Sequence, residues 1–252
     1  MRGADYSVLR EAYRADKGPS RALCLAGAAG DKAIATISLT TRGARISAWE
    51  AKPHIPTRGA VVVIQEIFGV NSHIRQVADK LANHGYHAVA PALFDRVRPG
   101  VELGYDQDGV EKGREMVASL GFEGALDGVR GAYDYLGSYE KKVAAVGFCW
   151  GGTVAFLANT RFGVPCVSYY GGRTVPFLKE RPKAPLLLQF GEFDPLIPPE
   201  DIQAHREQLP SAEINVWPAG HGFNCDQRAD FNAEVAAQAM SRTLVFLQRC
   251  LR

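Results

Sequence analysis

The apolar positions follow two different periods along the chain. Residues 34–40 and 44–50 alternate between apolar and polar side chains and are joined through Thr-Arg-Gly, which predicts a β-hairpin. Later apolar runs are continuous and rich in β-branched residues, and they fall at 60–65, 87–90, 143–147, 164–169 and 185–190. A strand that helices cover on both faces needs such a run. The pattern therefore predicts a buried, mostly parallel sheet that opens with an antiparallel hairpin.

Helical spacing fills the intervals between these strands. Ser72 is the expected cap of a helix that ends at Gly85, with apolar side chains recurring at 74, 77, 78 and 81. Further helices are predicted at 109–120, 123–137, 151–161, 199–208 and 230–249. Strands that alternate with helices form one α/β domain, which we place at 31–252, and residues 1–30 are expected to be an N-terminal extension. Sites in such a sheet lie at the carboxyl ends of the strands.

Composition narrows the class of protein. The chain has 252 residues, of which 46% are hydrophobic and 22% charged, as in ordinary globular proteins. Because 29 basic residues stand against 27 acidic ones and no basic run is interleaved with aromatics, we expect no nucleic-acid partner. No apolar run approaches a membrane span, and the weakly apolar stretch at 22–30 is not expected to be a signal peptide.

Five scattered cysteines without a C-x-x-C pair suggest neither a disulfide framework nor a structural zinc site. A reducing, cytoplasmic location is the simplest expectation. A metal site made by Cys149, His221 and Cys225 is rejected, because no acidic or histidine partner stands at a convincing ligand spacing. The other histidines, including His73 and His205, are expected on helix surfaces or loops.

The stretch Gly147-Phe148-Cys149-Trp150-Gly151 carries the first candidate chemistry. Its spacing is that of the nucleophile elbow, in which a Ser or Cys sits on a strained turn between a strand and a helix. The glycines let the chain segments approach, and the start of the helix favours a thiolate. The competing interpretation is a small buried thiol beside a tight turn. Other candidate catalytic residues decide between these two interpretations of Cys149.

Two further residues stand at the ends of predicted strands. Asp194 follows the strand at 185–190, and His221 lies on a glycine-flanked loop after the short apolar run at 214–217. Each alone is compatible with a turn or a solvated surface. Together with Cys149 they occur in the order nucleophile, acid, histidine, which is the order of the α/β-hydrolase triad. The sequence thus predicts a Cys149-His221-Asp194 triad.

From about Ala33 to the C-terminus the chain resembles the dienelactone hydrolase family, α/β-hydrolases with a cysteine nucleophile. The resemblance rests on Q-E-I-F-G-V-N at 65–71, P-A-L-F-D-R at 91–96, G-F-C-W-G-G at 147–152, Y-Y-G at 169–171 and A-G-H at 219–221. It implies an α/β-hydrolase fold, and hydrolysis of a carboxylated lactone such as carboxymethylenebutenolide to maleylacetate through a thioester. It also implies a place in the degradation of aromatic compounds.

The resemblance also assigns further residues. Glu66 matches the family glutamate that helps to generate the thiolate, and the backbone N–H groups of Ile67 and Trp150 match the oxyanion hole. Arg96 matches an arginine that binds the substrate carboxylate, with Arg98 as a stand-in. One of Tyr169 and Tyr170 matches a site tyrosine, although an aromatic pair there is equally typical of core packing.

The chain departs from the family pattern after the triad histidine. Gly222 stands where a serine is expected, and Cys225 stands where a second arginine is expected, so Arg228 is the remaining candidate for that clamp. Two alternatives stay open: a general carboxylesterase for neutral esters, and a catalytically silent protein that binds ligands or senses oxidants through Cys149. We expect no cofactor, a small lactone or ester as partner, no membrane partner, and a monomer, with a dimer left open.

Overall fold

The structure is a computed structural model that describes residues 36–252. Eight strands form one sheet, at Thr36–Thr40 (β1), Arg45–Ala51 (β2), Ala60–Ile64 (β3), His87–Pro91 (β4), Val143–Phe148 (β5), Cys166–Tyr169 (β6), Leu186–Gly191 (β7) and Glu213–Trp217 (β8). Their order across the sheet is β1-β2-β4-β3-β5-β6-β7-β8. The predicted extension at 1–30 and the apolar stretch at 22–30 lie outside the described residues.

The sheet is mixed in the predicted way. β1 pairs antiparallel with β2, and β2 pairs antiparallel with β4, whereas every later pair is parallel. All five residues of β3 and all six of β5 are buried. Continuous apolar runs therefore form the centre of the sheet, as their composition requires.

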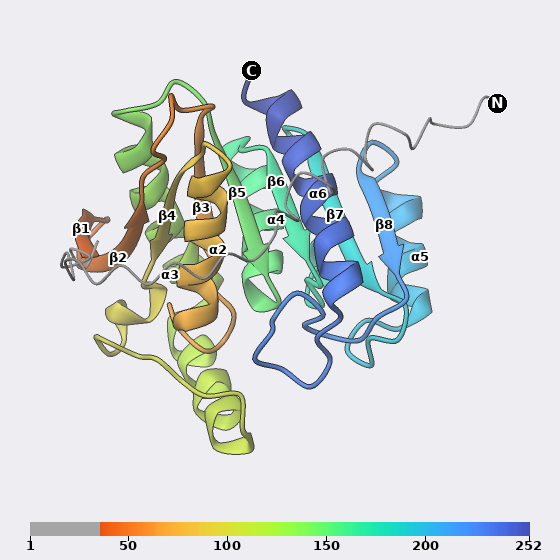
Figure 1. Cartoon of the computed structure of the whole chain (residues 1–252). Helices are drawn as coiled ribbons and strands as arrows, with labels where there is room; N and C mark the ends of the chain where they lie inside the picture. Colours follow the sequence, from red (N-terminus) through yellow and green to blue (C-terminus); the bar gives the residue numbers. More distant parts are fainter. Residues whose placement is uncertain (1–35) are drawn as a thin grey trace, which may run out of the picture. The chain divides into compact units, whose positions relative to one another are not determined.

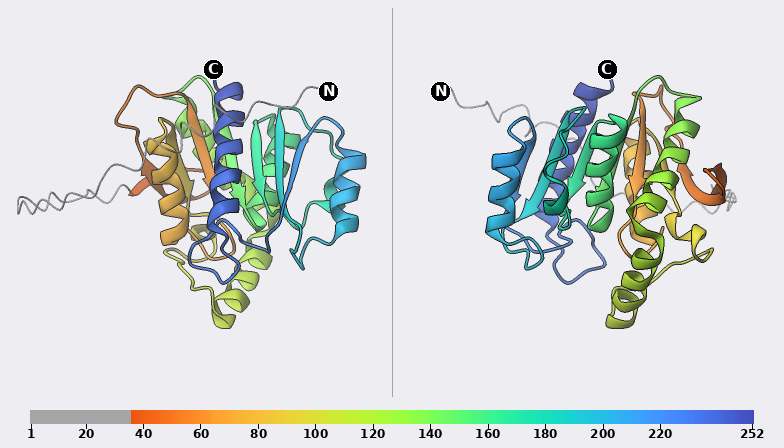
Figure 2. Two further views of the ribbon diagram at one scale, coloured as in Figure 1. Left: turned by 45° about the vertical axis from the view of Figure 1, so that its right-hand side comes forward. Right: turned by 180° about the vertical axis from the view of Figure 1, so that it is seen from behind.

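Helices cover both faces of the sheet. They are Ser72–Asn83 (α2), Gln107–Gly137 (α3), Trp150–Phe162 (α4), Pro199–Gln208 (α5) and Ala233–Cys250 (α6), with short 3₁₀ turns at Leu93–Arg96 (η1) and Val175–Phe177 (η2). Helices α2 and α6 lie on one face, and α3, α4 and α5 lie on the other (Figures 1 and 2). The sheet is thus doubly covered, and its loops at the carboxyl ends of the parallel strands are free to form a site.

Helix boundaries depart from expectation at two points. The cap of α2 is Asn71, whose side chain accepts a hydrogen bond from the backbone N–H of Ile74, and Ser72 is the first helical residue. The two helices predicted at 109–120 and 123–137 form one run, α3, interrupted by Gly121 with φ 64° and ψ 176°. A non-helical glycine inside a helix redirects the axis, so the predicted division survives as a kink.

Three histidines predicted at the surface are buried instead. His73 is 2% exposed, His87 is 4% exposed and His205 is 1% exposed. His87 pairs with Glu50 inside the molecule, and His205 packs against Phe190. Periodicity did not reveal this burial, because a histidine on the apolar stripe of a helix or strand has no pattern of its own. Among the described helices, none has the length and apolarity to cross a membrane.

Candidate functional site

Cys149 lies at the bend between β5 and α4, at the carboxyl end of a central strand. Its backbone has φ 54° and ψ −121°, a conformation that residues other than glycine rarely adopt. A Cβ atom on Gly147 would lie 1.9 Å from the carbonyl oxygen of Gly151, and one on Gly151 would lie 2.3 Å from that of Gln65. The motif therefore forms the strained elbow that its spacing predicts, with a half-buried thiol at the sheet edge.

The thiol, the imidazole and the carboxylate form a continuous chain of contacts. His221 Nε2 lies 3.1 Å from Cys149 Sγ, and His221 Nδ1 lies 2.7 Å from Asp194 Oδ2. The other oxygen of Asp194 accepts a hydrogen bond of 2.8 Å from the backbone N–H of Leu196, which fixes the carboxylate. Three loops, which follow β5, β7 and β8, thus bring together the three residues that the sequence singles out.

His221 is protonated more readily than an ordinary histidine. Burial alone would lower its pKa, because a charged ring loses its water. The hydrogen bonds to Asp194 and Cys149 act in the opposite direction and dominate, so the pKa of His221 rises from 6.5 to about 10. A positive ring 3.1 Å from a sulfur atom stabilises its negative form. His221 is therefore placed to take a proton from Cys149.

Glu66 is fully buried just after β3, and its two oxygens have different partners. The hydroxyl of Tyr105 donates to Oε2 over 3.3 Å, and Arg228 Nη1 lies 3.3 Å from Oε1. Both contacts are longer than ordinary hydrogen bonds to a carboxylate. No hydrogen bond joins Glu66 to Cys149 within the described residues, so in this structure the thiol faces His221.

Backbone donors stand beside the thiol. Trp150 is the first residue of α4, so its N–H has no acceptor within the helix. Ile67 follows Glu66, and both Ile67 and Trp150 line the cleft that contains Cys149. The Trp150 side chain points into an aromatic stack with Phe94 and Phe122. Both residues that the family resemblance assigns to the oxyanion hole therefore line the cleft that contains Cys149.

A cleft of about 340 Å³ contains Cys149 and His221. Its apolar lining comes from Phe68, Val110, Val117 and Leu196. Three arginines also line it, namely Arg114 in the first half of α3, Arg173 after β6 and Arg228. Within residues 36–252, Arg114 and Arg173 make no ion pair. The cleft thus combines an apolar wall with cationic groups that have no carboxylate partner in the described part of the chain.

The structure does not bring Arg96 to this cleft. Arg96 lies at the end of η1, forms an ion pair with Asp127 of α3 and donates to the hydroxyl of Thr41 over 2.9 Å. Arg98 is exposed and does not line the cleft either. The resemblance predicts that the Arg96 guanidinium binds the substrate. In the structure it binds Asp127, which lies 31 positions away along the chain.

Neither tyrosine of the 169–170 pair lines the cleft. Both are fully buried, and the hydroxyl of Tyr169 shares a hydrogen bond of 2.6 Å with Thr243. The ring of Tyr170 meets that of His221 edge-on, with centroids 5.2 Å apart, and its φ is 40°. Tyr169 is thus a core residue, and Tyr170 is a packing neighbour of the triad histidine.

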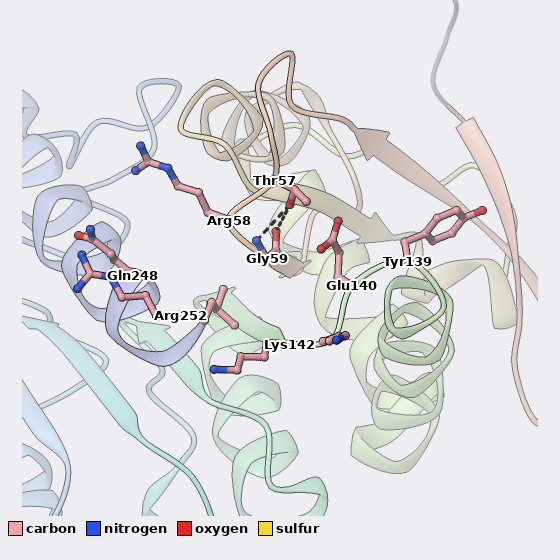
Figure 3. A pocket seen from close by; sticks show the side chains of 10 residues that line it. Thr57, Arg58, Gly59, Tyr139, Glu140, Lys142, Gln248 and Arg252 are labelled. Atoms are coloured by element: carbon pink, nitrogen blue, oxygen red, sulfur yellow. Dashed lines mark hydrogen bonds between the residues drawn. The ribbon is translucent and has the colours of Figure 1, made fainter.

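A second hollow, of about 630 Å³, lies away from the triad. Figure 3 shows its lining, which includes Arg58, Lys142 and Arg252. It lies where α3 and α6 end, at Gly137 and Cys250. Cations near helix C-termini compensate the partial negative charge there. We therefore assign these side chains to helix ends, and the smaller hollow with Cys149 remains the candidate site.

Sequence reasoning did not identify several residues of the site. Arg114 and Arg173 line the cleft, and Tyr105 and His73 lie next to Glu66. Each lies on a helix or loop without a motif, and only packing brings it to the site. One signal was present: His73 lies in the first turn of the helix that follows Glu66, so a short loop holds the two close together.

The fold and the cleft define an α/β-hydrolase that acts on carboxylic esters, and comparisons with known proteins agree. The family model for the dienelactone hydrolase family matches residues 46–251, so the chain belongs to that family. The chain is 32% identical over 198 residues to the carboxymethylenebutenolidase of Pseudomonas putida, covering 74% of this chain and 84% of that protein.

Solved structures share the fold. One from Klebsiella pneumoniae subsp. pneumoniae, described as "Putative Dienelactone Hydrolase", is 27% identical, has a TM-score of 0.75 and covers 84% of this chain and 96% of its own. An esterase from Pyrococcus furiosus shares the fold at a TM-score of 0.63, with 16% identity and coverage of 86% and 92%. The protein is thus a carboxylic ester hydrolase of the dienelactone hydrolase family.

Proposed function

We propose that the protein hydrolyses a lactone or ester that carries an anionic group, with Cys149 as the nucleophile. The observation that supports this most directly is the position of His221, with one ring nitrogen 3.1 Å from the Cys149 sulfur and the other 2.7 Å from Asp194. An imidazole oriented by a carboxylate and directed at a strained thiol is the arrangement of a nucleophilic hydrolase. The dienelactone named by the family is the first substrate to assay.

In the first step, His221 takes the proton of the Cys149 thiol, and Cys149 Sγ attacks the carbonyl carbon to form a carbon–sulfur bond. The carbonyl oxygen becomes an oxyanion, which the N–H groups of Ile67 and Trp150 stabilise. Each such donor typically contributes about 2.7 to 4 kcal/mol. The carbon–oxygen bond of the ester or lactone then breaks. The leaving oxygen takes the bonding electron pair and the proton that His221 holds, so His221 is neutral again and a thioester remains on Cys149.

In the second step, His221 removes a proton from water, and the resulting hydroxide attacks the thioester carbonyl. The carbon–sulfur bond breaks, the sulfur keeps the electron pair, and the carboxylic acid leaves. Asp194 holds the ring in the tautomer that this proton transfer needs. Glu66 supports the first step by favouring the thiolate when substrate enters, a role that follows from the family resemblance and from its full burial beside the cleft residue Arg228.

Three cleft arginines support an anionic substrate. Arg114 and Arg173 have no carboxylate partner among residues 36–252, and Arg228 shares only a long contact with Glu66. Guanidinium groups bind carboxylates through paired hydrogen bonds. We assign the substrate anion to these residues in place of Arg96. The apolar wall formed by Val110 and Val117 then holds the body of the substrate.

The ion pair between Arg96 and Asp127 favours one alternative, a preference for neutral esters. Turnover of an acidic lactone and of its neutral methyl ester separates the two. We expect the double change Arg114→Gln with Arg173→Gln to raise KM for the acidic lactone by about 10-fold or more, because each charge-assisted hydrogen bond contributes about 1.5 to 3 kcal/mol. The neutral ester is unaffected, and Arg96→Gln is the matched control.

Cys149→Ala tests the chemistry itself. We expect turnover of both substrates to fall by on the order of 10⁴-fold, because the residual rate comes from binding and the oxyanion donors alone. Mass spectrometry of wild type during turnover should detect an acyl group on Cys149. Equal rates for wild type and Cys149→Ala would refute the nucleophile. A protein that only oxidises Cys149 would show no turnover in either form.

A further inference from the structure

Three side chains that bind metals meet beside the cleft from separate parts of the chain. Glu66 follows β3, His73 lies in the first turn of α2, and Cys225 lies in the loop after β8. One ligand atom from each lies within 4.8 Å of the other two. All three residues are buried, with exposed fractions of 0%, 2% and 0%. The proposed hydrolysis uses neither His73 nor Cys225.

The cluster also contains a polar atom without a partner. His73 Nε2 is buried and makes no hydrogen bond within the described residues. The buried hydroxyl of Tyr170 lacks a partner in the same way. Buried polar atoms in folded proteins nearly always have a partner, so an unpartnered nitrogen on a histidine of this cluster points to a missing one.

We propose that Glu66, His73 and Cys225 form a binding site for Zn²⁺. A thiolate, an imidazole and a carboxylate are the three ligand types that zinc accepts, and this mixture of soft and hard donors suits zinc better than magnesium or calcium. Zinc bonds of 2.0 to 2.3 Å in a tetrahedron place ligand atoms about 3.3 to 3.8 Å apart. Small changes in side-chain torsion angles close the remaining distance.

The fourth zinc ligand and the charged residues around the site can also be named. A water molecule can occupy the fourth position, next to the hydroxyl of Tyr105, which lies 3.3 Å from Glu66. On binding, Cys225 releases its thiol proton to solvent. Arg228, whose side chain is 19% exposed and lines the cleft, must leave Glu66. Its contact with Glu66 is long, at 3.3 Å, so turning towards the cleft breaks no short ion pair.

Zinc in this site also affects the proposed reaction. The ion takes Glu66, which the proposed function uses to favour the Cys149 thiolate. Zinc therefore inhibits hydrolysis, and this consequence, unlike the binding itself, rests on the proposed function. Inhibition that disappears in His73→Gln places the ion in this cluster, because His73 has no part in the proposed reaction.

Cobalt titration of the full chain tests the site. Co²⁺ replaces Zn²⁺ in such sites, and a thiolate ligand gives it an intense near-ultraviolet charge-transfer band. Chelator-treated Cys149→Ala protein is titrated with Co²⁺, and Zn²⁺ is then added to displace it. Removing Cys149 excludes the triad thiol as the ligand. We expect one equivalent of Co²⁺ per chain, with the band, and its loss on addition of zinc.

Variants locate the ion. In the Cys149→Ala background, we expect Cys225→Ser to abolish the band. We expect His73→Gln to weaken Co²⁺ binding at least about 100-fold, because the loss of a direct ligand should cost no less than the largest losses seen for residues that only support a ligand. The matched controls are Cys166→Ser and His205→Gln, which must bind as before. His205 is a strict control, because its Nε2 is also buried without a partner but it does not belong to the cluster.

Thermal unfolding followed by circular dichroism checks that each variant is folded, and Cys225→Ala replaces Cys225→Ser if the latter is not. Absence of the band in Cys149→Ala protein, or a band that survives Cys225→Ser, would overturn the proposal. Loss of binding on changing His221 but not His73 would overturn it as well. Because these measurements need no turnover, failure of the zinc site and failure of the hydrolase are distinguishable.

Discussion

Two buried carboxylates, Glu50 and Glu66, have similar partners but different geometry. Glu50 in β2 lies 2.9 Å from His87, accepts from the hydroxyl of Tyr135 over 2.8 Å and lies 3.3 Å from Lys52. Glu66 also has a tyrosine and a cation, but both contacts measure 3.3 Å.

This difference in geometry indicates a structural role for Glu50 and a functional role for Glu66. Around Glu50, two short hydrogen bonds hold one carboxylate oxygen and join β2, β4 and α3. Around Glu66, long contacts leave the carboxylate free to change partner when a substrate or an ion arrives. Contacts in an unliganded active site are often long in this way, since they shorten only when the reacting group is bound. We therefore expect Glu50 to contribute to folding and Glu66 to activity.

Exchanging each carboxylate for an amide tests this contrast most strongly. We expect Glu66→Gln to lower kcat by about 10²-fold or more, since proton-transfer groups contribute 10² to 10⁴, while the free energy of unfolding changes little. Glu50→Gln should lower the free energy of unfolding by about 1 to 3 kcal/mol and leave kcat unchanged. Urea denaturation and steady-state kinetics on both variants provide the test. The opposite outcome would remove the distinction.

The two tyrosines provide a smaller, matched test. Tyr135→Phe removes a 2.8 Å hydrogen bond to Glu50, and we expect the free energy of unfolding to fall by about 1.5 to 3 kcal/mol, the range for hydrogen bonds to charged groups. Tyr105→Phe removes a 3.3 Å contact and should cost about 1 kcal/mol or less. Equal losses in chemical denaturation would show that the two networks are equally strong.

The smallest expected effect is the loss of the Glu50 contribution to stability at acid pH. Burial alone would raise the pKa of Glu50, but hydrogen bonds from Tyr135, His87 and Lys52 together lower it below 4.5. A carboxyl with a depressed pKa in the folded state stabilises the fold above its unfolded pKa, and this contribution is lost as the pH falls through the folded value. The stability difference between wild type and Glu50→Gln should therefore be constant near neutral pH and shrink below pH 4.5. A difference that stays constant down to pH 3 would contradict this.

The sequence sufficed for the parts that local chemistry determines. Continuous apolar runs predicted the parallel strands, and the glycines around Cys149 predicted the elbow. The motif around Cys149 predicts where that residue lies, because the tight turn at the end of the strand accepts only certain residue types. The order of Cys149, Asp194 and His221 was sufficient to predict three residues that the fold then brings together.

The parts that the sequence could not predict depend on contacts between distant segments. Arg96 was assigned from its motif, but its partner Asp127 lies on α3, and no local pattern shows that the two meet. Arg114 and Arg173 reach the cleft only because α3 and the loop after β6 lie beside it. The spacing of Cys225, four residues after His221, gave no convincing metal site. That Cys225 lies close to Glu66 and His73 is visible only in three dimensions.

The kink at Gly121 divides α3 into two parts with separate duties. The second part packs on the sheet through buried residues such as Ala125 and Val129, whereas the first part, yellow-green in Figure 1, extends past the strand ends and supplies Val110, Arg114 and Val117 to the cleft. The first part nevertheless anchors itself through the buried Met116 and Val117. Substitutions at its cleft-facing positions, such as Val110 and Arg114, can therefore alter the substrate wall without touching Cys149, Asp194 or His221.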